Sequence, residues 1–250
     1  MISKAQIKRI RLLHKLKGRQ EQKKFLVEGI RAVEEVLKSN LNVNEVYIVS
    51  SESDNENKVP GYEHYKVISE KQMNAISALR TPPGILAVVD QPPPLKKPDT
   101  DKDVVVLDGI KDPGNLGTIM RTAHWFGINQ IICSNDCVDV YNPKTVQSTM
   151  GSIGYVKVVV LDLLDFIRTY NSHFFFAGMQ MEGTDIKMAK TDLKNIALII
   201  GSEAFGISDE VSRLLDESIS ILPHDNQNKP ESLNASIAAA IGMFHFMVSK

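Results

Sequence analysis

A segment in the middle of the chain combines residue types that could bind a phosphate. Residues 112–121 read Asp-Pro-Gly-Asn-Leu-Gly-Thr-Ile-Met-Arg, so an irregular turn with two glycines leads to an arginine. Arginine suits phosphate because its planar fork donates several hydrogen bonds at once. If a helix begins near Asn115, that residue could cap it, and Arg121 would project nearly two turns further on. The spacing alone is equally typical of a helix cap followed by a solvated arginine.

A second polar turn lies in the last third of the chain, where Gly201 and Gly206 stand on either side of Glu203. Glycines let a backbone approach a ligand closely, as many phosphate sites require. The chain nevertheless contains neither G-x-G-x-x-G nor G-x-x-x-x-G-K-[ST]. The Glu203 carboxylate would repel a pyrophosphate and favour a ligand with an amine or a positive charge. The turn therefore argues against a dinucleotide or nucleoside triphosphate site.

A third polar segment, Ser232-Leu233-Asn234, opens a long apolar run near the end of the chain. Its hydroxyl, its amide and the free backbone N–H groups of a helix start could hold a ligand. Ser and Asn are also common helix caps, so this segment taken alone indicates no more than a cap. The run that follows predicts a buried helix, and its large side chains are expected in packing or at a subunit interface. These are Met243, Phe244, Phe246 and Met247.

Strands and helices that alternate after residue 103 must position these segments. Strands are predicted at residues 104–107, 130–133, 156–160, 174–177, 197–200 and 219–222. Helices are predicted at residues 116–126, 163–170, 209–215 and 232–248. Near-continuous apolar strands separated by helices indicate a mostly parallel sheet covered on both faces, which is a doubly wound α/β domain. Each polar segment follows a strand, and such sheets bind ligands at their strand-to-helix junctions.

A proline-rich stretch divides the chain. Four prolines between residues 92 and 98 cannot continue a sheet or a helix interior, so residues 91–102 are predicted to be a linker. Residues 1–90 then form a smaller α/β domain, and residues 103–250 form the doubly wound one. In the smaller domain we expect helices near residues 7–16 and 29–37 and strands at residues 46–49, 65–68 and 85–89.

The amino terminus is basic on one side. Residues 1–24 hold nine lysines and arginines against a single acid, Glu21, although the whole chain has a net charge of −1. The charged side chains down one face of the predicted helix include Lys8, Arg11, Lys15 and Arg19. A one-sided basic helix favours salt-sensitive, sequence-independent binding of nucleic-acid phosphates. The ordinary alternative is a solvated helix face.

Composition excludes several other classes of protein. With 250 residues, of which 43% are hydrophobic, the chain can bury one large core or two smaller ones. Cys133 and Cys137 cannot form a disulfide framework, and a C-x3-C pair without a second Cys or His pair is a poor zinc signature, so no metal is expected. No signal peptide is evident and no apolar run approaches the roughly 20 residues of a membrane span. We therefore expect a cytoplasmic protein.

The three polar segments together resemble one family, the SpoU/TrmH group of RNA ribose 2'-O-methyltransferases in the knotted SPOUT superfamily. Its first motif, an Asn followed by a Gly and an Arg, is matched within residues 112–123. Its Gly-x-Glu-x-x-Gly turn is matched within residues 198–207. Its Pro-containing strand end and Ser-Leu-Asn helix start are matched at residues 221–223 and 232–238. The likeness covers residues 104–250.

The resemblance implies a fold and an activity. The fold would be a SPOUT α/β knot, a deep trefoil knot on a mostly parallel sheet, with a smaller N-terminal α/β domain that binds the substrate. Residues 25–29 and 81–87 are similar to that smaller domain of the family. The activity would be methyl transfer from S-adenosylmethionine to a ribose 2'-hydroxyl of ribosomal or transfer RNA by a homodimer. Two alternatives are an RNA-binding assembly protein without methyl transfer and a base-directed SPOUT methyltransferase.

The resemblance also implies roles for individual residues. The implied catalytic residues are Asn115, Arg121, Glu203 and Asn234. The implied cofactor-binding residues are Gly201, Glu203, Gly206, Ile221, Leu222, Ser232 and Leu233. The implied RNA-binding residues are Lys8, Arg11, Lys15, Arg19 and Arg121. Because a guanidinium stays protonated in proteins, we expect Arg121 to grip the adjacent phosphate and stabilise a developing alkoxide, while Asn115 and Asn234 orient the reacting groups.

Overall fold

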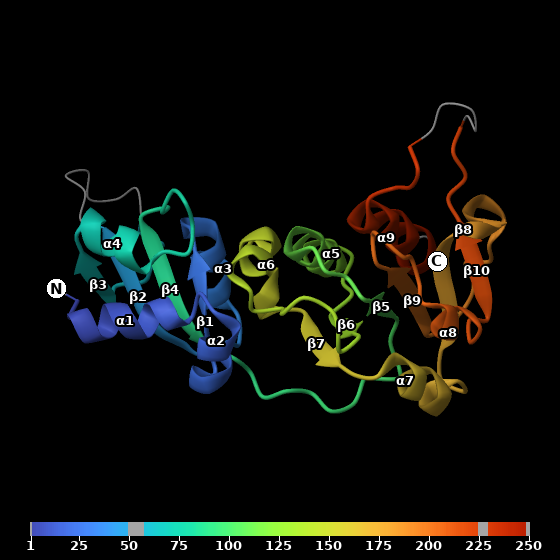
Figure 1. Ribbon diagram of the computed structural model, residues 1–250, viewed down its shortest axis with the longest axis horizontal. Helices are drawn as coiled ribbons and strands as arrows, with labels where there is room; N and C mark the ends of the chain where they lie inside the picture. Colours follow the sequence, from blue (N-terminus) through green and yellow to red (C-terminus); the bar gives the residue numbers. More distant parts are fainter. Residues whose placement is uncertain (1, 50–57, 225–229, 249–250) are drawn as a thin grey trace. The chain divides into compact units, whose positions relative to one another are not determined.

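Two sheets organise the chain, one in each of two units (Figure 1). The structure, a computed structural model, describes residues 2–49, 58–224 and 230–248. Contacts divide the chain into a first unit of Met1–Pro93 with Asp139–Tyr155 and a second unit of Pro94–Val138 with Val156–Lys250. The sequence analysis placed residues 139–155 in the C-terminal domain, whereas their contacts place them in the first unit.

The sheet of the first unit has four strands in the order β1-β4-β2-β3. These are β1 (Lys24–Glu28), β2 (Val43–Val49), β3 (Tyr65–Ile68) and β4 (Ile85–Asp90). β2 and β3 run parallel, and the other neighbours are antiparallel. β2, β3 and β4 were predicted from the sequence. β1 was not predicted, because it is short and follows a basic, helical stretch.

Helices pack on both faces of this sheet. α1 (Lys4–Leu12) and α4 (Glu70–Ile76) share a core with the sheet through Ile10, Leu13, Met73 and Ile76. α3 (Ile30–Lys38) contacts β1 and β4. The helix expected at residues 7–16 is in fact two, α1 and α2 (Leu16–Gln22), because the backbone of Lys15 is extended between them. Gly18 permits this break, since a Cβ there would lie 2.0 Å from the Leu12 carbonyl oxygen.

Residues 139–155 are held in the first unit by a helix, a polar anchor and close backbone packing. They form α6 (Pro143–Thr149), which contacts β1, and the 3-10 turn η1 (Ser152–Gly154), which contacts α3. Arg19 Nε and Nη2 donate to Asp139 Oδ2 at 2.8 and 2.6 Å. A Cβ at Gly151 would lie 2.4 Å from the Glu35 Cβ. These partners are more than a hundred residues apart, so local sequence patterns give no sign of them.

The sheet of the second unit is fully parallel over its six strands, in the order β10-β8-β9-β5-β6-β7. The strands are β5 (Val104–Asp108), β6 (Gln130–Cys133), β7 (Lys157–Val160), β8 (Phe175–Asp185), β9 (Ile196–Gly201) and β10 (Glu217–Ser220). β5, β6 and β9 are apolar and almost completely buried. The parallel, doubly covered α/β sheet predicted from the sequence is thus confirmed.

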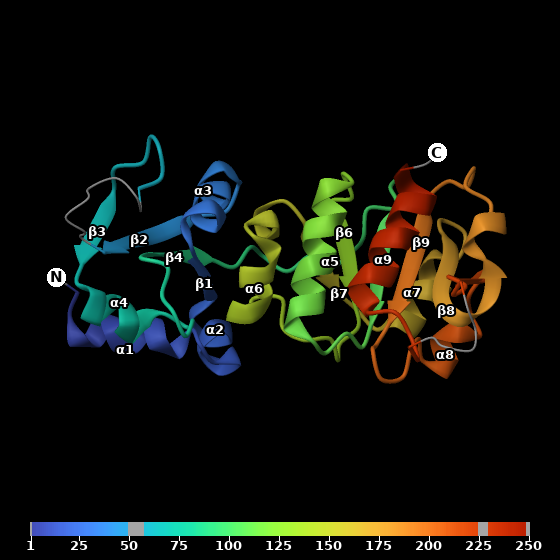
Figure 2. The same ribbon diagram turned by 90° about the horizontal axis from the view of Figure 1, so that it is seen from above.

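Two pairs of helices cover the two faces of this sheet (Figures 1 and 2). α7 (Leu163–Tyr170) and α8 (Asp209–Ser212) share a core with Val106 and Ile199. α5 (Pro113–Trp125) and α9 (Ala235–Met243) lie side by side on the other face, where a Cβ at Gly242 would come within 2.9 Å of Leu198. One π-helical turn, η3 (Phe244–Val248), extends α9, and a 3-10 turn, η2 (Ile186–Met188), follows β8.

None of the helices in the described part of the chain has both the length and the apolar character that a membrane crossing requires.

Candidate active site

The three polar segments lie at one edge of the parallel sheet, where β5 and β9 end at Asp108 and Gly201. Parallel strands end on the same side, so the loops that follow them share that edge. The loop after β5 leads into α5, whose N-cap Asp112 accepts a 2.8 Å hydrogen bond from the backbone N–H of Asn115. The helix α9 begins at the same edge with Asn234 as its N-cap, accepting from the backbone N–H of Ser236 at 2.9 Å.

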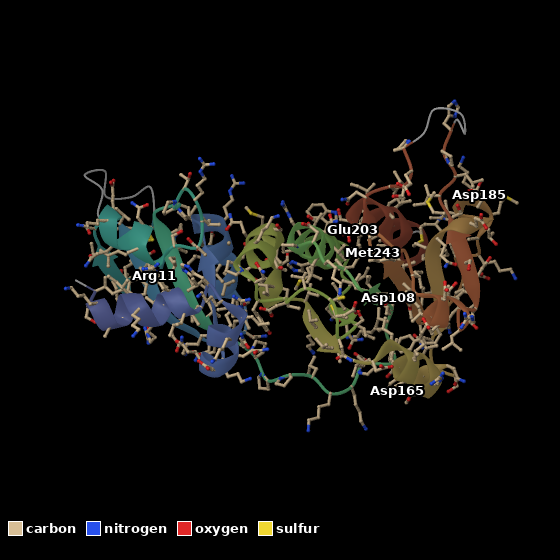
Figure 3. All side chains as sticks on the ribbon, viewed as in Figure 1. Arg11, Asp108, Asp165, Asp185, Glu203 and Met243 are labelled. Carbon is tan, nitrogen blue, oxygen red and sulfur yellow. The ribbon has the colours of Figure 1, made fainter. Side chains whose placement is uncertain are left out.

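Three of the predicted catalytic side chains are joined by hydrogen bonds. Asn115 Nδ2 donates to Glu203 Oε1. Asn234 Nδ2 donates to Asn115 Oδ1 at 2.9 Å. We call Asn115, Glu203 and Asn234 the amide–carboxylate triad. Its members come from three loops far apart in the sequence, and Figure 3 shows Glu203 beside α5 and α9. The amide of Asn115 is bonded on both sides, so its orientation is fixed.

The Gly201–Gly206 turn is closed by its own backbone. Ser202 and Gly206 exchange two N–H to carbonyl hydrogen bonds of 2.9 Å each. A Cβ on Gly201 would lie 2.0 Å from the Gly206 carbonyl carbon, and Gly206 has a φ of +67°. Both positions therefore need glycine, the first for close backbone approach and the second for its left-handed backbone. The turn holds Glu203 against Asn115.

The other predicted cofactor residues lie on two loops of the second unit. Ile221 and Leu222 directly follow β10, and Ser232 and Leu233 directly precede the N-cap of α9. Leu222 is 56% exposed and Leu233 is 45% exposed. Among residues 2–49, 58–224 and 230–248, no side-chain hydrogen bond or ion pair joins these four residues to the triad. It shows apolar side chains open to solvent on loops that flank polar groups.

Arg121 stands apart from the triad on an exposed position of α5, six residues beyond Asn115. Within residues 2–49, 58–224 and 230–248 its guanidinium makes no hydrogen bond or ion pair. All its donors are thus available to an anion from outside the chain.

The predicted RNA-binding residues of the first unit divide into two groups. Lys8, Arg11 and Lys15 are exposed and have no ion pair among the described residues, and Figure 3 labels Arg11 on α1. We call these three the basic face. Arg19 is 3% exposed and bound to Asp139 and to the Leu13 carbonyl. The prediction for Arg19 was wrong, because a buried guanidinium with its donors already paired cannot reach a phosphate.

Sequence reasoning missed the residues that support the loop before α5. Ser134 Oγ accepts from the backbone N–H of Gly109 at 2.9 Å and donates to Asp136 Oδ1 at 2.5 Å. Lys111 Nζ donates to Asp136 Oδ2 at 2.7 Å, and these two bonds lower the pKa of Asp136. The signal was present, because residues 134–136 also follow a buried strand at the ligand-binding edge.

A thiol packs against the same loop. Cys137 Sγ donates to the Leu107 carbonyl at 3.3 Å. Hydrogen bonding with Cys133 lowers the pKa of Cys137 to about 7, and the same contact, with burial, raises the pKa of Cys133. The two cysteines therefore contribute to the packing behind the loop that carries Asn115.

Comparison with known proteins agrees with this geometry. The model of the SpoU rRNA methylase family matches residues 102–244, more than half of the chain. The chain belongs to the SpoU rRNA methylase family. A second model, the MRM3-like substrate binding domain, matches residues 4–87 of this SpoU-family protein. The two matches correspond to the second sheet with its loops and to most of the first unit.

Relatives with names and solved structures support the membership. The 23S rRNA (guanosine(2553)-2'-O)-methyltransferase RlmP of Bacillus subtilis is 31% identical over 238 residues, which span 93% of this chain and 92% of RlmP. A TrmH-family structure from Porphyromonas gingivalis superposes with a TM-score of 0.86 at 30% identity, covering 100% of both chains. An AdoMet-bound rRNA methyltransferase from Sinorhizobium meliloti gives a TM-score of 0.83 at 26% identity, covering 100% of this chain and 97% of that one.

Proposed function

We propose that this SpoU-family protein transfers a methyl group from S-adenosylmethionine to a ribose 2'-hydroxyl of RNA. The observation that carries the proposal is the amide–carboxylate triad, in which hydrogen bonds join Asn115, Glu203 and Asn234 from all three family motifs. Family membership supports it, as does the 2'-O-methyltransferase named among the similar proteins.

The residues at this edge fit S-adenosylmethionine. Its adenosine needs apolar walls beside backbone polar groups, and its sulfonium and ammonium favour a nearby carboxylate. Leu222 and Leu233 offer exposed apolar side chains, and Glu203 offers the carboxylate. A Cβ at Gly206 would meet no atom within 4 Å, so this glycine leaves backbone open to close approach, while Gly201 lets the turn close on itself. Ile221 and Ser232 would complete the set that holds the cofactor.

The chain's own residues would orient the RNA and bear its charge. When bound, S-adenosylmethionine supplies an electrophilic methyl carbon. Methylation then requires the 2'-oxygen to be held in line and to lose its proton, and positioning can contribute much of the rate. Asn115 and Asn234 present amide groups whose orientation is fixed before substrate arrives. Arg121, with its guanidinium unpaired in the described chain, grips the adjacent phosphate and stabilises negative charge on the 2'-oxygen.

The first unit would supply most of the affinity for RNA. Lys8, Arg11 and Lys15 present three charges without an ion pair in the described chain, and the match to a substrate binding domain spans residues 4–87 of this unit. Such contacts are long-ranged and salt-sensitive, and they carry no sequence information. Ribosomal RNA is the first substrate to test, because RlmP is named for 23S rRNA, and transfer RNA is the second. Either substrate is consistent with the cytoplasmic location expected from the sequence.

A homodimer through the second unit completes the proposal. Exposed apolar side chains recur along α9 and η3 at helical spacing: Ile237, Ile241, Phe244 and Val248. Trp125 at the end of α5 is 84% exposed. A contiguous apolar stripe of this kind on a protein surface is typical of an interface. In sedimentation velocity we expect a dimer for the wild type and a monomer for Ile241→Glu.

We also propose the trefoil knot of the superfamily, although threaded chains are very rare among proteins. One supporting feature is the close backbone approach between the paired strands β8 and β10 at the register shift after Ser218, where a Cβ on Gly183 would lie 2.3 Å from the Ser218 carbonyl oxygen. Closely packed backbones of this kind are what a threaded loop requires. The parallel order of the six strands and the superposition on TrmH-family structures also support it.

The test of the proposed function is a methylation assay. The protein is incubated with labelled S-adenosylmethionine and total RNA from cells that lack it, and the product is mapped by its resistance to alkaline cleavage, which a 2'-O-methyl confers. We expect methylation at a defined ribose. A label found on a base would identify a base-directed enzyme instead. Tight RNA binding with no label transferred would identify an assembly protein.

A further inference from the structure

One side chain at the candidate site has no role in the proposed mechanism. Phe205 is 92% exposed, the highest fraction among the large apolar side chains of the described residues. It lies two residues after Glu203 in the Gly201–Gly206 turn. Within the described residues its ring contacts no other aromatic ring. An aromatic ring placed fully in water forgoes the free energy of burial, so its partner should come from outside the chain.

The turn does not itself require a phenylalanine at this position. Its closure depends on the paired backbone bonds of Ser202 and Gly206 and on the two glycines. The Phe205 backbone N–H donates to Ser202 Oγ at 3.2 Å, but its ring takes no part. Any side chain could occupy position 205 without changing these contacts, so the ring is free to serve recognition.

The same contacts fix where the ring stands. Two backbone hydrogen bonds between Ser202 and Gly206 close the turn, and the backbone N–H of Phe205 also donates to the Ser202 hydroxyl. Glu203 within the turn is bonded to Asn115, which in turn is bonded to Asn234. Phe205 is therefore presented from a rigid support next to the triad, as a substrate-positioning group needs to be.

We propose that Phe205 stacks on the base of the nucleotide that is methylated and so positions its ribose at the triad. The inference rests on the proposed function and assigns RNA positioning to a residue at one of the unspecified positions of the Gly-x-Glu-x-x-Gly turn. RNA is recognised mainly at unstacked bases that stack on aromatic side chains. Every base has a π-face, so Phe205 contributes affinity and orientation without selecting a sequence. Specificity for the target then comes from RNA shape and from contacts elsewhere.

Aromatic and aliphatic substitutions separate stacking from simple apolar contact. Phe205→Tyr and Phe205→Trp should keep the wild-type KM for RNA, whereas Phe205→Leu and Phe205→Ala should raise it by about 5- to 150-fold. The Kd for S-adenosylmethionine, measured by calorimetry, should stay unchanged in all four variants. Met188→Ala is the matched control, because it removes a 78% exposed apolar side chain from the same unit. Equal KM values for wild type and Phe205→Leu would overturn the proposal.

An abasic RNA tests the base itself. The mapped target fragment is prepared with and without the base of the methylated nucleotide, and both are bound to wild type and to Phe205→Leu. For wild type we expect loss of the base to weaken binding by about the factor that Phe205→Leu causes. For Phe205→Leu the two fragments should bind equally, because the stacking partner is already gone. Independent, additive losses, or sensitivity only to a neighbouring base, would contradict the assignment.

Two further outcomes distinguish a failure of the Phe205 assignment from a failure of the proposed function. If wild type methylates no ribose in any RNA, the proposed function fails and Phe205 has no nucleotide to stack on. If wild type methylates RNA but Phe205→Leu changes the sedimentation coefficient and leaves KM alone, the ring is a subunit contact and only the inference fails. Circular dichroism of each variant should match wild type, since an exposed side chain makes no core contact.

Discussion

The ligand-binding edge of the second unit and the basic face of the first unit both present polar side chains, but they hold them in opposite ways. At the edge, Asn115, Glu203 and Asn234 are bonded to one another, so their geometry exists before any substrate arrives. On the basic face, Lys8, Arg11 and Lys15 are exposed and unpaired within the described chain. Catalysis depends on fixed geometry, whereas attraction of a polyanion depends on charge alone. Substitutions at the two regions should therefore alter different kinetic constants.

The largest effect is expected at the centre of the triad. Asn115→Ala removes both side-chain hydrogen bonds that link Glu203 to Asn234, so kcat should fall by about 100- to 1000-fold while KM for RNA changes little. Single-turnover methylation measures the change. Asn171→Ala, which alters an exposed asparagine after α7, is the control and should keep the wild-type rate. If Asn115→Ala instead lost affinity for RNA and kept the wild-type kcat, the triad and the basic face would not differ in the kinetic constant that they control.

Arg19 offers the next largest effect, and on stability instead of activity. Its guanidinium is buried and paired with Asp139, and removing one partner of a buried pair leaves the other uncompensated. Arg19→Met should lower the free energy of unfolding by about 3 kcal/mol in urea titrations. Arg11→Met removes the same charge from the exposed face and should change stability by less than about 0.5 kcal/mol. Equal decreases in the free energy of unfolding for the two variants would refute the assignment of Arg19 to the folded core and of Arg11 to the exposed face.

Arg121, on α5 of the second unit, tests whether charge alone or a fixed geometry matters for contact with a phosphate. Arg121→Lys keeps the positive charge but cannot reproduce a two-pronged contact with phosphate. We expect kcat/KM to fall about 10- to 100-fold, the usual loss for a charge-assisted hydrogen bond. Turnover close to wild type would count against the bidentate role and would make Arg121 part of the electrostatic surface.

The basic face should show a smaller effect that depends on salt. Replacing Lys8, Arg11 and Lys15 together with glutamine should reduce the slope of log Kd against log salt by about 2 to 3, with kcat unchanged. Filter binding at several salt concentrations measures the slope. A triple variant of the exposed second-unit lysines Lys187, Lys190 and Lys194 removes the same charge and is the control. If both triple variants change the slope equally, net charge explains the binding and the basic face has no special role.

The comparison also shows which features a sequence reveals. β5, β6 and β9 could be predicted almost to the residue, because strands buried on both faces have continuous apolar runs. The juxtaposition of Asn115, Glu203 and Asn234 followed from strand ends that share an edge and from the family motifs. Arg19 could not be distinguished from Arg11, because the partner that buries it, Asp139, is 120 residues away. The contacts of residues 139–155 with the first unit were missed for the same reason.

The smallest expected effect is on the pH dependence of stability, and it compares a hydrogen-bonded carboxylate of the first unit, Glu45, with an exposed one. Burial raises the pKa of Glu45, but hydrogen bonds from Lys66, Tyr47 and Arg9 outweigh it and lower the pKa from 4.5 to about 2. Because the folded pKa lies below the unfolded one, this stabilisation is present above about pH 4.5 and is lost as the pH falls toward 2.

Thermal unfolding from pH 7 to pH 2 should therefore show a wild-type advantage over Glu45→Gln that is constant above about pH 4.5 and shrinks below it. Glu63→Gln changes an exposed carboxylate of the same unit that has no ion pair in the described chain, and its curve should parallel that of wild type throughout. An advantage over Glu45→Gln that persists at pH 2 would mean that packing, and not the ionised carboxylate, is what Glu45 contributes. Glu45 would then stabilise the fold through its packing alone, and the contrast between fixed and free charge would apply to binding alone.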